Sequence, residues 1–151
     1  EGTAAEQEAA KLALSNTQGW YIRLDAAKGE KVMSDSITFD NQLVFTTYLP
    51  EGSSNPCASA AGSSRLWIVD LLNAKATRDS NNNGIYDASE RYNSLSHPGI
   101  APKPVIIYNP NATGDDGQPL TLCAGTECLG KEDNPFADTN PFAKTYWREN
   151  P

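Results

Sequence analysis

The sequence predicts a mainly β protein built from antiparallel sheets and preceded by one N-terminal helix. The 11 glycines and 10 prolines interrupt the chain too often for long helices beyond residue 20. Short runs rich in β-branched and aromatic residues alternate with turn-forming residues, a pattern typical of strands. Strong helix formers are concentrated in residues 4–14, where Asn16 and Gly19 supply stop signals.

The strands are expected from residue 19 onward. Residues 36–39 and 42–48 are predicted to form a hairpin, because Asp40 and Asn41 between them make a two-residue turn signal. The complete set of predicted strands is 20–24, 36–39, 42–48, 65–72, 104–108, 120–123 and 143–148.

Length and charge bound the class of protein. A chain of 151 residues makes one domain, or part of one, with room for a real core. The formal net charge of −7 argues against nucleic acid and against an anionic membrane surface as partners. The chain has no apolar run of the roughly 18 residues that a membrane span needs. It begins with neither an initiator methionine nor a signal peptide, so we expect a mature, processed or excised chain.

The three cysteines point to an extracytoplasmic, oxidising compartment with one disulfide. Cys123 and Cys128 lie close in sequence and are the favoured pair, although spacing alone leaves pairing with Cys57 open. Two close cysteines also suit a metal, but His97 is the only histidine, and no second cysteine pair exists to complete a zinc site.

Residues 79–90, DSNNNGIYDASE, have the spacing of a calcium-binding loop. Calcium takes six to eight oxygen ligands at about 2.3–2.6 Å, and this loop places oxygen donors at its positions 1, 3, 5, 9 and 12. The glycine at position 6 permits the sharp turn. The predicted calcium ligands are the side chains of Asp79, Asn81, Asn83, Asp87 and Glu90 and the carbonyl of Ile85.

The alternative to a metal site is an ordinary turn, since Asp, Asn, Ser and Gly also build Asx-turns without any ion. In an EF-hand a helix precedes the calcium loop, whereas a strand is predicted before this one. Asp87 and Glu90 have the spacing of a capping box, which predicts a short helix running to Ser94. We therefore expect a strand, a calcium loop and a short helix, as in a rigid structural or regulatory site.

Nothing in the sequence indicates an enzyme. His97 lies beside Pro98 in an expected loop, where a structural or solvated imidazole is favoured over a general base.

Trp20, Trp67 and Trp147 fall in predicted strands and are expected to pack in the core. The near-repeat of Asn-Pro-Phe at 134–136 and 140–142 predicts two turns whose phenylalanines pin the C-terminal tail to the core.

Several segments, in their order and spacing, resemble the carboxy-terminal region of the PilY/PilC proteins of type IV pili. They are 19–24 (GWYIRL), 30–32 (EKV), the 39–48 hairpin with FTTY, 56–57 (PC), the 64–72 strand with its calcium loop, 99–105 (GIAPKPV) and 145–149 (TYWRE). The resemblance covers residues 19–149 and leaves the helix within residues 1–18 outside it, so we expect 19–151 to form the β domain.

The resemblance implies a secreted bacterial protein at the cell surface, acting in pilus assembly and in adhesion at the pilus tip. It implies a modified β-propeller whose calcium site influences pilus extension and retraction. By motif position, its calcium ligands are Asp79, Asn81, Asn83, Ile85 and Asp87. Propeller blades take about 40–50 residues each, so this chain has room for the last one to two blades. Either the chain is a fragment of a larger propeller, or a small protein has kept only the end of the domain and completes its sheet against a partner.

The predicted function is that of a calcium-binding, pilus-associated assembly and adhesion module. Its partners would be pilins, minor pilins, and host or abiotic surfaces. The alternative is a calcium-stabilised accessory or scaffold domain of another secreted protein, such as a carbohydrate-active enzyme, because the loop alone suits either.

Overall fold

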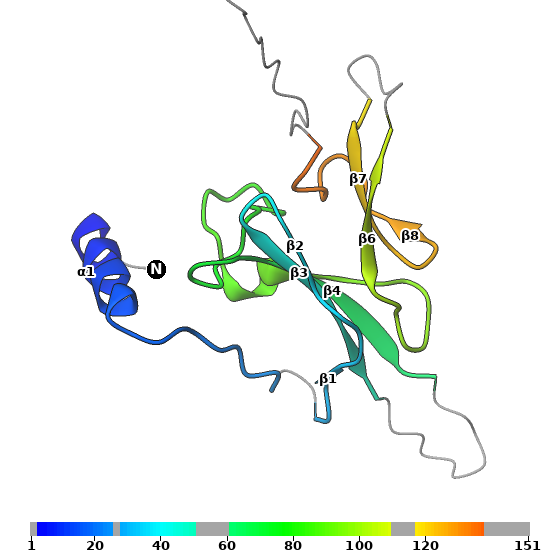
Figure 1. The fold of residues 1–151 in the computed structure, drawn as a ribbon, viewed down its shortest axis with the longest axis horizontal. Coiled ribbons are helices and arrows are strands. Elements are labelled where there is room, and N and C mark those ends of the chain that lie inside the picture. Colours follow the sequence, from blue (N-terminus) through cyan, green and yellow to red (C-terminus); the bar gives the residue numbers. More distant parts are fainter. Residues whose placement is uncertain (1–2, 26–27, 51–60, 110–116, 138–151) are drawn as a thin grey trace, which may run out of the picture.

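The computed structural model describes residues 3–25, 28–50, 61–109 and 117–137 (Figure 1). Its elements are helix α1 (Ala4–Ser15), strands β1 (Lys31–Val32), β2 (Ile37–Phe39), β3 (Gln42–Leu49) and β4 (Ser63–Asp70), the 3-10 turn η1 (Ala88–Arg91), and strands β5 (Tyr92–Ser94), β6 (Pro104–Tyr108), β7 (Leu120–Ala124) and β8 (Glu127–Cys128). The prediction of a mainly β protein with one N-terminal helix is confirmed.

The strands form two antiparallel sheets. The larger has the order β1-β3-β4-β5, with β2 also paired to β3, and the smaller has the order β6-β7-β8. Strands β3 and β4 pair along their whole length, from Gln42 opposite Asp70 to Leu49 opposite Ser63. The hairpin between β2 and β3 turns at Asp40 and Asn41, whose φ angles of 47° and 57° are those of a two-residue turn with both residues left-handed. The predicted hairpin is therefore confirmed.

One face of the larger sheet packs against the smaller sheet. Because side chains alternate along a strand, Val44, Leu66 and Ile68 share this face. Across from them lie Leu120 and Leu122 of β7. Burial of an aliphatic or aromatic side chain contributes about 1.5–3 kcal/mol, so this cluster holds the two sheets together.

Phe136 completes that cluster from the C-terminal side. Its side chain is fully buried, and its ring meets Phe39 edge-on with centroids 5.1 Å apart. Asn134 shapes the turn, because its side chain donates to the Leu120 carbonyl and accepts from the Phe136 N–H. The prediction that this Asn-Pro-Phe turn pins the tail to the core is confirmed. Its near-repeat at 140–142 lies outside the described residues.

The opposite face of the larger sheet carries a second cluster of Phe45, Trp67 and Val69. The Phe45 and Trp67 rings stack with centroids 5.7 Å apart. Trp20, Ile22 and Leu24 pack onto the cluster. This confirms core packing for Trp67 and places Trp20 at the edge of the core, while Trp147 lies outside the described residues.

The predicted strand at 20–24 is wrong. In the part of the chain that the structure describes, these residues belong to no strand, although their alternation of inward and outward side chains is real. Trp20 Nε1 instead donates to the Leu71 carbonyl at 2.9 Å. The segment buries alternate side chains on the face of the sheet rather than pairing with an edge, and sequence periodicity does not distinguish the two.

A buried carboxylate lies on the same side of the sheet, just before β1. Glu30 accepts from the Thr47 hydroxyl at 2.6 Å and from Arg65 at 3.0 Å, and its side chain has no exposed surface. Thr47 in turn accepts from Trp67 Nε1 at 3.0 Å, and the Arg65 guanidinium lies 4.3 Å from the centre of the Tyr92 ring. A buried charge is tolerated when it is paired and hydrogen-bonded in this way.

Helix α1 spans residues 4–15, one residue beyond the predicted end. Thr3 and Glu6 form a capping box at its start, and Asn16 closes its end. The helix lies apart from both sheets and is joined to them by the extended segment described above (Figure 1).

The disulfide joins Cys123 to Cys128, the favoured pair, with the Cα atoms 4.0 Å apart across β7 and β8. Cys57 lies outside the described residues, as do the predicted strand at 143–148 and the chain end. Strands β1 and β8 were not predicted, since two-residue strands carry too few residues for a period to show. The predicted helix to Ser94 is also too long: η1 ends at Arg91, and Tyr92 begins β5 by pairing with Trp67.

The substitution Phe136→Ala should lower the free energy of unfolding by about 3–5 kcal/mol, because it leaves a cavity between the two sheets. The control is Ile100→Ala, since Ile100 is largely exposed and its truncation should change stability little. Urea unfolding followed by tryptophan fluorescence measures both. Equal, small effects of the two substitutions would contradict the placement of Phe136 in the core.

Candidate metal site

The predicted calcium loop leaves β4 and returns to it. After β4 the chain turns at residues 71–74, and Ala76 bridges back to Val69. The chain then passes the buried Arg78, runs through residues 79–87, and enters η1. The return strand β5 pairs with β4, so both ends of the loop are fixed to the same strand.

The first half of the loop folds three predicted ligands onto one turn. The two carboxylate oxygens of Asp79 accept from the N–H groups of Asn83 at 3.1 Å and of Gly84 at 2.6 Å. Asn81 Oδ1 also accepts from the Asn83 N–H, at 3.0 Å. Asn83 Oδ1 accepts from the Ile85 N–H at 2.7 Å. These side-chain oxygens are thus gathered at one exposed turn, each with further lone pairs to offer.

Gly84 makes this turn possible. Its φ of +77° lies in the left-handed region, which a side chain with a Cβ adopts only at a cost. Asn82 is also left-handed, at φ 55°, and asparagine is among the residues that tolerate that conformation.

Asp87 lies at the far end of the loop and caps η1. Its Oδ1 accepts from the Ser89 N–H at 2.8 Å and from the Ser89 hydroxyl. The hydroxyl of Ser89, followed by the N–H groups of Ser89 and Glu90, lowers the pKa of Asp87 below its ordinary value. The carboxylate is therefore ionised at neutral pH, as a calcium ligand has to be. The predicted capping box is confirmed.

Glu90 is buried, and its carboxylate faces backbone N–H groups. One oxygen accepts from the Ser80 N–H at 2.8 Å, the Ser80 hydroxyl at 3.3 Å and the Asn81 N–H at 3.3 Å. The other accepts from the Asp87 N–H at 3.0 Å. Only 2% of the residue is exposed, whereas residues 81–86 around Gly84 are exposed.

Arg78 places a positive charge beside this carboxylate. Burial lowers the pKa of Arg78, and the charges of Asp133 and Glu90 oppose that effect. Its guanidinium donates to the carbonyl and carboxylate of Asp133 and to Asn93 Oδ1. Among the described residues, its buried Nε has no hydrogen-bond partner.

The loop fits a calcium ion in its chemistry and in part of its geometry. Its donors are all oxygens, and the turn brings Asp79, Asn81 and Asn83 together, with the Ile85 carbonyl next in sequence. Among the described residues, however, no group of three or more His, Cys, Asp or Glu side chains is placed to hold a metal ion. The acidic side chains of Asp79, Asp87 and Glu90 thus each satisfy a separate part of the loop's backbone.

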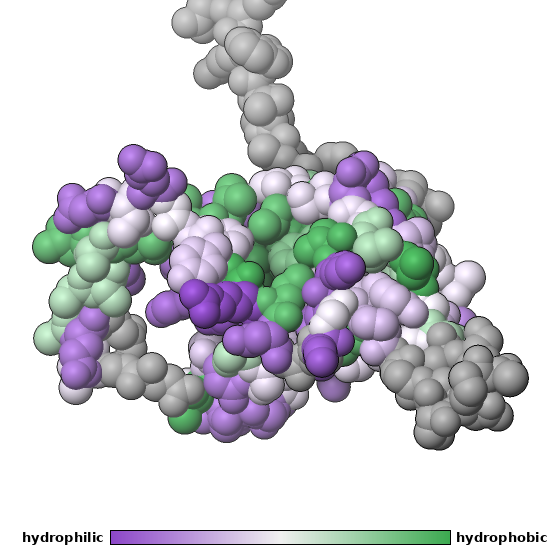
Figure 2. Space-filling view, turned by 90° about the horizontal axis from the view of Figure 1, so that it is seen from below, coloured by the Kyte–Doolittle hydropathy of each residue, from purple (hydrophilic) through white to green (hydrophobic). Residues whose placement is uncertain are grey.

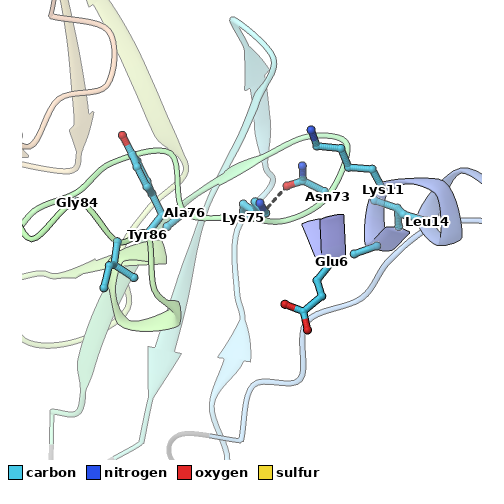
Figure 3. A pocket seen from close by; sticks show the side chains of 10 residues that line it. Glu6, Lys11, Leu14, Asn73, Lys75, Ala76, Gly84 and Tyr86 are labelled. Atoms are coloured by element: carbon cyan, nitrogen blue, oxygen red, sulfur yellow. Dashed lines mark hydrogen bonds between the residues drawn. The ribbon is translucent and has the colours of Figure 1, made fainter. Parts of the chain in front are cut away.

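An open cleft lies next to the loop. It has a volume of about 1030 Å³ and separates α1 from the body of the molecule (Figure 2). Glu6, Lys11 and Leu14 of α1 line one side, and Asn73, Lys75 and Tyr86 line the other (Figure 3). Tyr86 is more than half exposed there, so the cleft reaches the edge of the candidate metal loop.

His97, considered above as a candidate base, has an exposed side chain. Its Nδ1 lies 3.5 Å from Glu127 Oε1, and the Ser96 and His97 N–H groups donate to the same carboxylate. Burial raises the pKa of Glu127, but these hydrogen bonds outweigh burial and lower it overall. The contact therefore links β8 to the loop that follows β5.

No family model, no curated protein and no solved structure matches this chain. Among the described residues, no helix is long and apolar enough to cross a membrane.

The substitution Gly84→Ala should lower the free energy of unfolding by about 1–2 kcal/mol, through the left-handed backbone alone. A Cβ at this position meets no atom of the described residues within 4 Å, so steric overlap with them does not contribute. Gly130→Ala is the matched control, because its added Cβ also meets nothing and its φ is not positive. Thermal melting in chelator measures both, and equal melting temperatures would contradict the role assigned to Gly84.

Proposed function

We propose that residues 79–87 bind one calcium ion and that the chain is a calcium-dependent assembly and adhesion module of type IV pili. The observation that carries the calcium proposal is the turn at Gly84, onto which the side-chain oxygens of Asp79, Asn81 and Asn83 are folded. An Asx-rich turn without a metal explains the backbone contacts, but it gives no reason for this spacing of oxygen donors over nine residues.

The ligands in this proposal are the side chains of Asp79, Asn81, Asn83 and Asp87 and the Ile85 carbonyl. Bound calcium would supply two positive charges that offset the two carboxylates of the set and join the first half of the loop to Asp87. The pKa of Asp87 is already lowered by its hydrogen bonds, so calcium need not displace a proton from it at neutral pH. Two amide ligands in place of carboxylates favour a moderate affinity, with Kd of about 10⁻⁶ M or weaker.

The pilus part of the proposal rests on the order of segments that resembles the PilY/PilC carboxy-terminal region. Two structural features support a module that meets another chain. In the described sheets, β5 and β6 are edge strands. Val105 and Ile107 of β6 are each about half exposed. Exposed apolar edge strands are suited to pairing with a strand from a partner, here a pilin, a minor pilin or the rest of a propeller.

Calorimetric titration of calcium into chelator-treated protein should show one saturable site, and Asp79→Ala and Asp87→Ala should each remove it. The control is Asp35→Asn, which removes a negative charge at an exposed position outside the loop and should leave binding unchanged. Both loop variants should remain folded in chelator, because the core clusters contain neither residue. Calcium binding retained in Asp79→Ala would contradict the proposed ligand set.

The pilus role predicts that the purified chain binds isolated type IV pili in calcium and is released by chelator. Asp79→Ala should bind the pili no better in calcium than the parent binds in chelator. Sedimentation of the chain with pili measures this, and pelleting without pili gives the background. One calcium site with no pilus binding would favour the accessory or scaffold domain of another secreted protein.

A further inference from the structure

We propose that Glu90 is a positioning residue, whose carboxylate ties residues 80–81 to Asp87 and shapes the loop for calcium without binding the ion. The spacing of the loop predicts Glu90 as a calcium ligand, so this is a different role for the same side chain. The inference rests on the proposed calcium site, because it concerns how that site is held open for an ion.

The hydrogen bonds of Glu90 leave little capacity for a metal. An ionised carboxylate offers about four lone-pair positions, and Glu90 accepts four hydrogen bonds. A bidentate ligand would have to present both oxygens to the ion, yet three of the four donors converge on one of them. Turning toward the metal would leave the N–H groups of Ser80, Asn81 and Asp87 without this acceptor in a partly buried site, which is costly.

The positions of these donors show which parts of the loop the Glu90 carboxylate connects. Ser80 and Asn81 lie in the first half of the loop, and Asp87 lies at its end. A single buried carboxylate therefore joins the two arms at the base of the loop. The exposed turn around Gly84 is left to present Asp79, Asn81 and Asn83.

The charge beside Glu90 supports the same role. Arg78 is buried, and its positive charge interacts with Glu90. A calcium ion bound by Glu90 would come close to this second cation in a site with little water, and like charges repel most strongly where water is scarce. At the Gly84 turn, in contrast, Asn81 and Asn83 are exposed and Asp79 is only partly buried.

Amide hydrogen exchange in chelator, compared between the parent and Glu90→Gln, tests whether the Glu90 carboxylate holds residues 80–81. The substitution is nearly isosteric, but it removes the negative charge and places an amide donor against N–H groups. Exchange at Ser80 and Asn81 should accelerate at least ~10-fold, because the charge-assisted bonds are lost. Calcium Kd should rise by no more than ~10-fold, as expected when a binding-competent conformation becomes less populated. The matched ligand variant, Asp79→Asn, should abolish calcium binding and leave exchange at Ser80 and Asn81 unchanged.

Unchanged exchange in Glu90→Gln, together with loss of calcium binding, would overturn the proposal and restore Glu90 as a ligand. A second measurement needs no variant. In the parent protein, the Ser80 and Asn81 amides should be protected in chelator and stay protected in saturating calcium. Faster exchange on adding calcium would show that Glu90 leaves them for the ion. If the parent binds no calcium, the proposed function fails, whereas exchange in chelator still decides whether Glu90 holds the loop.

Discussion

The full-length pairing of β3 with β4 is the interaction on which the rest of the structure depends. Both strands are buried on both faces, so their register decides which side chains meet the smaller sheet and which meet the 20–24 segment. Because side chains alternate, a slip of β4 by one residue against β3 would turn Trp67 to the inner face in place of Ile68. The Asp40–Asn41 turn, in which both residues are left-handed, fixes the residue at which β3 begins after β2.

The candidate metal loop depends on the same pairing. It departs from the end of β4 and returns as β5 on the free side of β4, so its two ends are positioned by one strand. Two buried carboxylates flank the sheet, and each is neutralised in a different way. Glu30 is held by a guanidinium and a hydroxyl, whereas Glu90 is held mainly by backbone N–H groups, which keeps an irregular segment in one conformation.

The sequence predicts the elements whose signal is local. The helix, the hairpin at Asp40–Asn41, the strand at 104–108, the capping box and the Cys123–Cys128 disulfide were all predicted, because caps, turns and close cysteine pairs act over a few residues. The 20–24 segment was mistaken for a strand because packing on a face and pairing at an edge give the same alternation. Within the loop, spacing identifies the turn of Asp79, Asn81 and Asn83. It does not reveal that Glu90, beyond its capping contact with Asp87, also accepts from the Ser80 and Asn81 N–H groups, because that depends on how the loop folds back on itself.

The most direct test of this account is a crystal structure of the chain grown in calcium, with an anomalous difference map to locate the ion. We expect one peak at about 2.3–2.6 Å from the side-chain oxygens of Asp79, Asn81 and Asn83, the usual range for calcium ligands. The Ile85 carbonyl and Asp87 should complete the shell, while the carboxylate of Glu90 remains on the Ser80 and Asn81 N–H groups. A loop without a peak at saturating calcium would contradict the metal site. A peak bound by both oxygens of Glu90 would contradict the division between ligands and support described here.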